Sequence, residues 1–235
     1  LAAVRSGLER YLRARTGSTV AVRPQPCPSS QPDAHPAERP LVHSDGQALY
    51  LPEEIDLLAQ RSDNAALYKL LVKLEAGAFE FGTFELDLDK VIDSAGVAWR
   101  PDAATAPATG SDLQRFVRMF DHPLIALDLF TVFEHARVAG RVGRRYPGLA
   151  QRLGALLEQP FRQPGSDRHV GGTLYPLYRH LVMQADLSVG PPMTSFAEQM
   201  AKRFDQATAA GSDTVDTSAG LAMTGYRPLG QLTHA

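Results

Sequence analysis

Apolar residues recur at steps of three and four residues through most of this chain of 235 residues, and this period constrains the fold more than any other feature. Such spacing places the apolar side chains along one face of a helix. It predicts helices over 1–16, 65–79, 111–121, 124–145, 149–159, 174–187 and 196–204. Gly17 is expected to end the first helix and Ser111 to cap the third. The predicted fold class is therefore mainly α, with one or two short strands.

Prolines and glycines divide the chain into segments. Six prolines lie within Pro24–Pro40, so 17–47 is expected to be a Pro-rich linker or surface loop. The run Ala48-Leu49-Tyr50-Leu51 is typical of a short strand, and Pro52 after it favours the edge of a sheet. The other segments are expected to be an N-terminal helix over 1–16, a helical domain over 48–210 that contains a loop at 80–110, and a polar tail over 211–235.

The composition excludes several classes of protein. Hydrophobic residues make up 44% and charged residues 21% of the chain, which is ordinary for a globular protein. A net charge of -2 provides no general attraction to nucleic acid or anionic lipid. Cys27 is the only cysteine, which rules out an internal disulfide, a zinc finger and an iron–sulfur cluster. With no long apolar run and a highly charged beginning, we expect a cytoplasmic protein without membrane insertion.

The common catalytic and nucleotide-binding motifs do not occur in this sequence. It contains no P-loop, no GxGxxG, no GxSxG and no intact HExxH. The segment Asp216-Thr217-Ser218-Ala219-Gly220 comes near the DxSxS metal-binding loop of von Willebrand A domains, but it ends in Gly and follows no hydrophobic strand. The histidines have no second histidine at a ligand spacing. We therefore expect no metal site, no cofactor and no catalytic residue of these kinds.

Two stretches carry a more specific pattern. The first continues a helix through Glu75-Ala76-Gly77-Ala78 into Glu80-Phe81-Gly82-Thr83, downstream of Leu51-Pro52. The second runs from Glu134-His135-Ala136-Arg137-Val138 to Arg144-Arg145-Tyr146-Pro147-Gly148-Leu149. Over 48–158 the chain resembles the family of the nitric oxide reductase activation protein NorD and the Rubisco-activase subunit CbbO.

This resemblance implies a degenerate zincin scaffold. Many relatives have His-Glu-Ala-Gly-His in the first motif, which is the spacing of a zincin helix with two histidine ligands and a catalytic Glu. Here Leu74 and Ala78 stand at the two histidine positions, and neither side chain binds a metal. Glu75 and Glu134 would then be remnants of an active site, without metal or catalysis. The alternative for both is a buried carboxylate paired with Arg137 or another arginine.

The relatives also have a C-terminal von Willebrand A domain and work with a MoxR-type AAA+ ATPase that remodels an enzyme. The resemblance therefore implies a non-enzymatic adaptor between such an ATPase and a client, such as nitric oxide reductase or Rubisco. Because the sequence starts at Leu1 rather than Met, we expect it to be the front piece of a longer chain. The candidate contacts to an acidic partner surface are Arg137, Arg141, Arg144 and Arg145. An ordinary solvated helix face is the alternative for these arginines.

Two other functions stay open at this point. The first is a metal-dependent hydrolase that uses Glu75 and Glu134 in an atypical site, with His135 as a further ligand. The second is nucleic-acid binding through the arginine-rich face. The net charge of -2 and the lack of aromatic residues interleaved with the arginines count against this second function.

Overall fold

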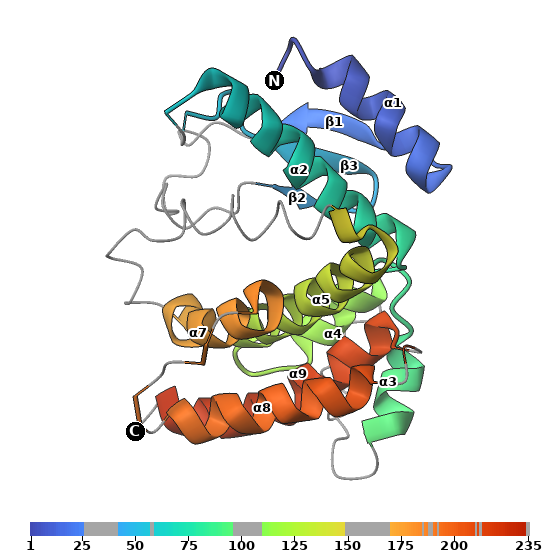
Figure 1. Cartoon of the computed structure of the whole chain (residues 1–235). Coiled ribbons are helices and arrows are strands. Elements are labelled where there is room, and N and C mark those ends of the chain that lie inside the picture. The colour runs from blue at the N-terminus through green and yellow to red at the C-terminus, as the bar shows by residue number, and fades with distance from the viewer. Residues whose placement is uncertain are drawn as a thin grey trace. The chain divides into compact units, whose positions relative to one another are not determined.

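The computed structural model of the chain (Figure 1) describes residues 1–25, 42–56, 59–95, 110–148, 170–184, 186–187, 190–191, 193–209, 211 and 213–233. The described residues form eight helices and three short strands, so the prediction of a mainly helical fold is confirmed. The chain divides into two compact units. Unit 1 comprises Leu1–Phe81 and Arg141–Ser166, and unit 2 comprises Gly82–Gly140 and Asp167–Ala235. The helical domain predicted over 48–210 is thus shared between both units.

Unit 1 combines two helices with a small sheet. Its described elements are helix α1 (Arg5–Thr16), strands β1 (Ala21–Pro24), β2 (His43–Ser44) and β3 (Ala48–Leu51), and helix α2 (Arg61–Glu80). The strand order is β1-β3-β2, with β1 parallel and β2 antiparallel to β3. The prediction that β3 lies at an edge is wrong, because Pro52 follows the last paired residue and so removes no ladder hydrogen bond. The predicted linker over 17–47 also contains β1 and β2.

The core of unit 1 lies where the two helices pack against the sheet and against each other. Leu8 and Leu12 of α1 are buried there with leucines of β3 and α2. Gly17 ends α1 in the left-handed conformation with a φ of 72°, as predicted for a C-cap glycine.

The outer edge of β1 offers no free backbone N–H to another strand. The backbone N–H of Val22, which does not face β3, donates to Glu9 Oε1 at 3.2 Å. Pro24, the next residue with this orientation, has no N–H at all. An edge strand without free donors is a poor template for another strand, so β1 is protected against edge-to-edge pairing.

Unit 2 is a bundle of helices around a core rich in phenylalanine. Its helices are α3 (Leu88–Ala95), α4 (Asp112–Arg118), α5 (Pro123–Arg145) up to Gly140, α7 (Val170–Met183), α8 (Met193–Thr208) and α9 (Val215–Thr233). Phe116 lies at the centre of this core, with ring centroids 5.2 Å from Phe120 and 6.0 Å from Phe130. Ser111 forms the predicted cap of α4, in a capping box with Gln114.

Two segments of unit 2 differ from the sequence-based prediction. Helix α3 lies within the predicted loop at 80–110, and helix α9 occupies most of the predicted polar tail over 211–235. The tail was mispredicted because Gly, Ser and Thr are frequent in it, whereas Ala219, Ala222 and Leu229 are buried in the core of unit 2. Figure 1 shows α9 beside α8. The helix predicted over 149–159 lies outside the described residues.

The bundle helices approach each other closely at one glycine. A Cβ added to Gly225 of α9 would come within 3.2 Å of Met200 Cε in α8 and 3.4 Å of Leu129 Cδ2 in α5.

None of the helices in the described part of the chain is long and apolar enough to cross a bilayer.

Candidate functional site

Glu75, the first carboxylate singled out in the sequence, has a hydrogen-bond partner within unit 1. Helix α2 buries the face that carries Leu67 and Leu71, and Glu75 comes one turn later on a half-buried position. Ser44 Oγ of β2 donates to Glu75 Oε1 at 2.5 Å, within the range of a charge-assisted bond. The two positions that carry zinc-binding histidines in the resembled family are occupied by Leu74 and by the buried Ala78.

Glu134, the second carboxylate, lies in an almost fully buried ion pair within unit 2. Arg137, one turn further along α5, donates through Nη2 to Oε1 at 2.6 Å and through Nε to Oε2 at 2.8 Å. Thr83 Oγ1 donates to Oε1 at 2.5 Å. The side chains of Arg137 and Glu134 are only 1% and 2% exposed. A carboxylate with three donors and a forked guanidinium partner is already neutralised, which is the alternative role that the sequence analysis left open for Glu134.

A second buried arginine lies in unit 1, and no sequence motif indicated it. Arg15 of α1 donates through Nε to Glu80 Oε2 at 2.7 Å and through Nη1 to Tyr11 Oη at 3.0 Å and to the carbonyl of Lys73. Burial alone would lower the pKa of Arg15, but the hydrogen bonds to Glu80 and Tyr11 outweigh it and hold that pKa above its usual value. Arg15 therefore stays charged inside unit 1, although its side chain is only 6% exposed.

Tyr146 completes this group from the other motif. Its hydroxyl donates to Glu80 Oε1 at 2.9 Å, and its ring stacks on the Arg15 guanidinium with 4.5 Å between Cζ and the ring centroid. Both oxygens of Glu80 are therefore bonded, one to α1 and one to the end of α5. The Glu-Phe-Gly-Thr motif thus has a structural role at each end, through Glu80 in unit 1 and Thr83 in unit 2.

Gly82 of this motif has a conformation that favours glycine. Its φ is +71°, and a Cβ would meet Glu85 Oε2 at 2.8 Å. The turn that follows α2 therefore needs glycine between Phe81 and Thr83. This explains the motif by backbone conformation rather than by chemistry.

The four arginines proposed as partner contacts do not form one surface. Arg137 is buried against Glu134, so its assignment as a partner contact is wrong. Because Glu134 lies three residues earlier on the same helix, the guanidinium pairs with this carboxylate instead of facing solvent. Arg141 is half-buried and lies over the Phe81 ring, with Cζ 5.7 Å from the centroid. Arg144 and Arg145, in the last turn of α5, are exposed. The candidate surface is therefore reduced to these last two residues, bordered by Arg141.

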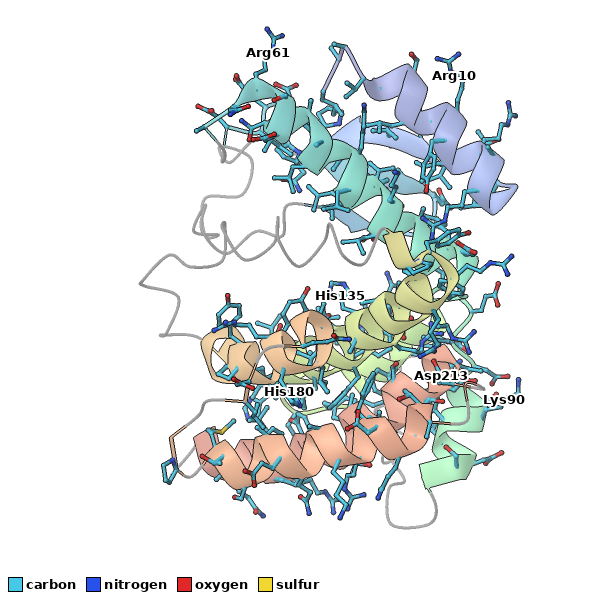
Figure 2. The ribbon with its side chains drawn as sticks, in the orientation of Figure 1. Arg10, Arg61, Lys90, His135, His180 and Asp213 are labelled. Atoms are coloured by element: carbon cyan, nitrogen blue, oxygen red, sulfur yellow. The ribbon has the colours of Figure 1, made fainter. Side chains whose placement is uncertain are left out.

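The residues considered as metal ligands are not gathered into one site. Glu75 and Glu134 belong to different units, and each accepts hydrogen bonds from within its own unit. His135 is exposed on α5, with its ring centroid 6.0 Å from that of Tyr178 (Figure 2). No group of three or more His, Cys, Asp and Glu side chains with ligand geometry occurs among the described residues.

Asp216, the first residue of the near-match to a von Willebrand A metal-binding loop, lies in the first turn of α9. Its Oδ1 accepts a hydrogen bond of 2.9 Å from the backbone N–H of Asp87, just before α3. Asp112 Oδ2 accepts from the next N–H, that of Leu88, at 3.2 Å. These carboxylates satisfy the free donors at the start of α3, which is a structural use of Asp216.

Comparison of the chain with protein-family models, with curated proteins and with solved structures found no match. The resemblance to NorD and CbbO thus stays a prediction that depends on the two motifs.

Proposed function

We propose that this chain is a non-catalytic adaptor that links a MoxR-type AAA+ ATPase to a client enzyme, such as nitric oxide reductase or Rubisco, which the ATPase activates or assembles. The observation that supports this most is the state of Glu134. Its two oxygens accept three hydrogen bonds from Thr83 and Arg137, and the side chains of Glu134 and Arg137 are almost fully buried. Metal binding at Glu134 would have to break this pair and leave Arg137 buried without its carboxylate, at a cost of about 3–5 kcal/mol.

The surface proposed for the ATPase is the C-terminal end of α5. Arg144 and Arg145 are adjacent in its last turn and exposed, and Arg141 borders them from the previous turn. Two adjacent guanidinium groups suit an acidic protein surface, because each can form a forked pair with a carboxylate. Such rim contacts raise the association rate and weaken as salt is added.

This proposal is tested by a pull-down with a MoxR-type ATPase from the same organism. The immobilised chain is expected to retain the ATPase at physiological salt, and the R144E/R145E variant is expected to retain much less. If neither this chain nor a longer form of the protein retains the ATPase, the adaptor function is refuted.

The hydrolase alternative is tested by the metal content of the purified chain. Because Glu75 and Glu134 accept internal hydrogen bonds in separate units, we expect well under one equivalent of zinc or iron after dialysis. One equivalent that survives dialysis and disappears in the Glu75→Gln variant would contradict the non-catalytic function.

A further inference from the structure

The exposed face of α5 carries two leucines near its start, where a solvated helix would have polar residues. Leu124 is 75% exposed and Leu127 is 38% exposed. Together with Phe84 they are the large hydrophobic residues that the described part of the chain exposes most. On the opposite side of α5, Ile125, Leu129 and Phe133 are buried in the core of unit 2. Leu124 and Leu127 therefore add nothing to the core.

An aspartate lies on the same face as the two leucines. Asp128 is four residues after Leu124, and this spacing brings its side chain beside that leucine on the helix surface. It is only partly exposed, and burial raises the pKa of its carboxyl above the usual value. Among the described residues, no hydrogen-bond donor or cation lies within bonding distance of its carboxylate. A second carboxylate, the exposed Asp121, comes just before α5.

We propose that Leu124, Leu127 and Asp128 form a docking ridge for a short basic amphipathic helix of a partner protein, with leucine-sized side chains against the two leucines and a Lys or Arg paired with Asp128. This proposal goes beyond the adaptor function, because it concerns the other end of α5 and a partner of opposite charge to the one proposed for Arg144 and Arg145. We call these three residues the α5 ridge.

The charge of the ridge is the reason for choosing a basic occupant. An apolar partner alone would cover the leucines but would desolvate Asp128 further, whereas a cation would compensate the burial that this carboxylate already suffers. Acidic residues outnumber basic ones in the sequence ranges of unit 2, so the net charge of this unit also favours a cationic partner. A helix that docks in this way carries its apolar anchors at steps of three and four residues. Leu124, Leu127 and Asp128 have the same steps on α5, so the two faces can lie against each other.

The test uses two synthetic helical peptides of 14 residues, one built from Leu and Lys and one from Leu and Glu with the same apolar face. Binding to the whole chain is followed by fluorescence anisotropy. We expect the Leu/Lys peptide to bind at least ten times more tightly than the Leu/Glu peptide. The variant L124S/L127S should weaken Leu/Lys binding at least tenfold, and Asp128→Lys should reverse the preference. Asp205→Lys, an equal charge change at an exposed position of α8, should leave binding unchanged.

Three results would overturn the proposal. One is Leu/Lys binding that is unaffected by L124S/L127S and by Asp128→Lys, since that would be general attraction to an acidic surface. Another is no detectable binding of the Leu/Lys peptide up to millimolar concentration. The third is self-association of the wild type in sedimentation velocity that L124S/L127S abolishes, because the occupant would then be a second copy of this chain. All these variants change exposed or partly exposed side chains, and cooperative thermal unfolding confirms that they fold.

Discussion

At the residue scale, Glu134 and Arg137 form a buried ion pair on α5. The carboxylate and the guanidinium are three residues apart on α5 and almost unexposed, and Thr83 supplies the remaining donor. A buried pair of this kind adds little stability over an apolar pair, but the loss of one partner leaves a buried charge. The loss of one partner therefore costs far more free energy of unfolding than the intact pair contributes.

The first prediction follows from this asymmetry. The Glu134→Ala variant is expected to lower the free energy of unfolding by about 3–5 kcal/mol, because Arg137 stays buried without its carboxylate. Glu75→Ala is the matched control, since Glu75 is only half-buried and accepts one hydrogen bond, from Ser44; its cost is expected to be about 1–2 kcal/mol. Urea unfolding measures both. If Glu134→Ala costs no more than Glu75→Ala, the description of a closed ion pair is wrong.

Asp128 gives the second prediction, which concerns pH. Its folded-state pKa is raised by burial, so the charged form is penalised in the folded chain. This penalty is complete above the folded-state pKa and vanishes as the pH falls below the unfolded value of about 4. Asp128→Asn should therefore stabilise the chain near pH 7, and the difference should shrink toward zero on acidification. If the Asn variant stabilises the chain equally at pH 7 and below the unfolded pKa of Asp, the pKa of Asp128 is not raised by burial.

The sequence identified part of the candidate site. It singled out Glu75 and Glu134 and left open a pairing with an arginine; Glu134 has this partner, whereas among the described residues Glu75 accepts a hydrogen bond from Ser44. It did not identify Arg15, whose partner Glu80 is 65 residues away, because one arginine among many on a charged helix carries no local signal. Arg137 was misassigned because it was grouped with the arginines that follow it on α5, two of which are exposed, whereas its own side chain is buried against Glu134.

At the scale of the elements, helical periodicity predicted six of the eight described helices; it missed the short helix α3, and composition misled at α9, where small residues form part of the buried stripe. Helices α1, α2, α4, α5, α7 and α8 were predicted, with ends that differ by a few residues. Helix α9 buries Ala219 and Ala222, and its glycines and threonines are typical of a loop by composition alone. Strand β3 lies in the centre of the sheet because it pairs with β1 as well as with the neighbouring β2, and the pairing with the more distant β1 is not encoded in the local sequence.

The glycines of α9 provide the third prediction. Among the described residues, no atom outside the neighbouring backbone of α9 lies within 4 Å of a Cβ at Gly220, so Gly220→Ala should stabilise the helix by about 0.5–1 kcal/mol. At Gly225 a Cβ would meet Met200 and Leu129, so the larger Gly225→Val should lower the free energy of unfolding by about 1–3 kcal/mol. Thermal unfolding of the two variants distinguishes these directions. An equal shift of the melting temperature in both would contradict the close approach of α9 to α8 and α5.

At the scale of the whole molecule, the two ends of α5 carry opposite chemistry. The last turn presents Arg144 and Arg145, and the first turns present the α5 ridge with its aspartate. Figure 2 shows Arg10 and Arg61 on α1 and α2 of unit 1, where they provide exposed arginines outside the proposed surface. The same unit therefore offers a matched control for charge reversal at Arg144 and Arg145.

The most direct test of the adaptor function is a calorimetric titration of the chain into the MoxR-type ATPase at two salt concentrations. The adaptor function predicts binding that weakens as salt rises and that R144E/R145E reduces at least tenfold. The control variant R10E/R61E has the same net charge and should bind like the wild type. Binding that is lost equally in both variants would reflect overall charge alone. Equal loss, or no binding by the wild type, would contradict the proposed function.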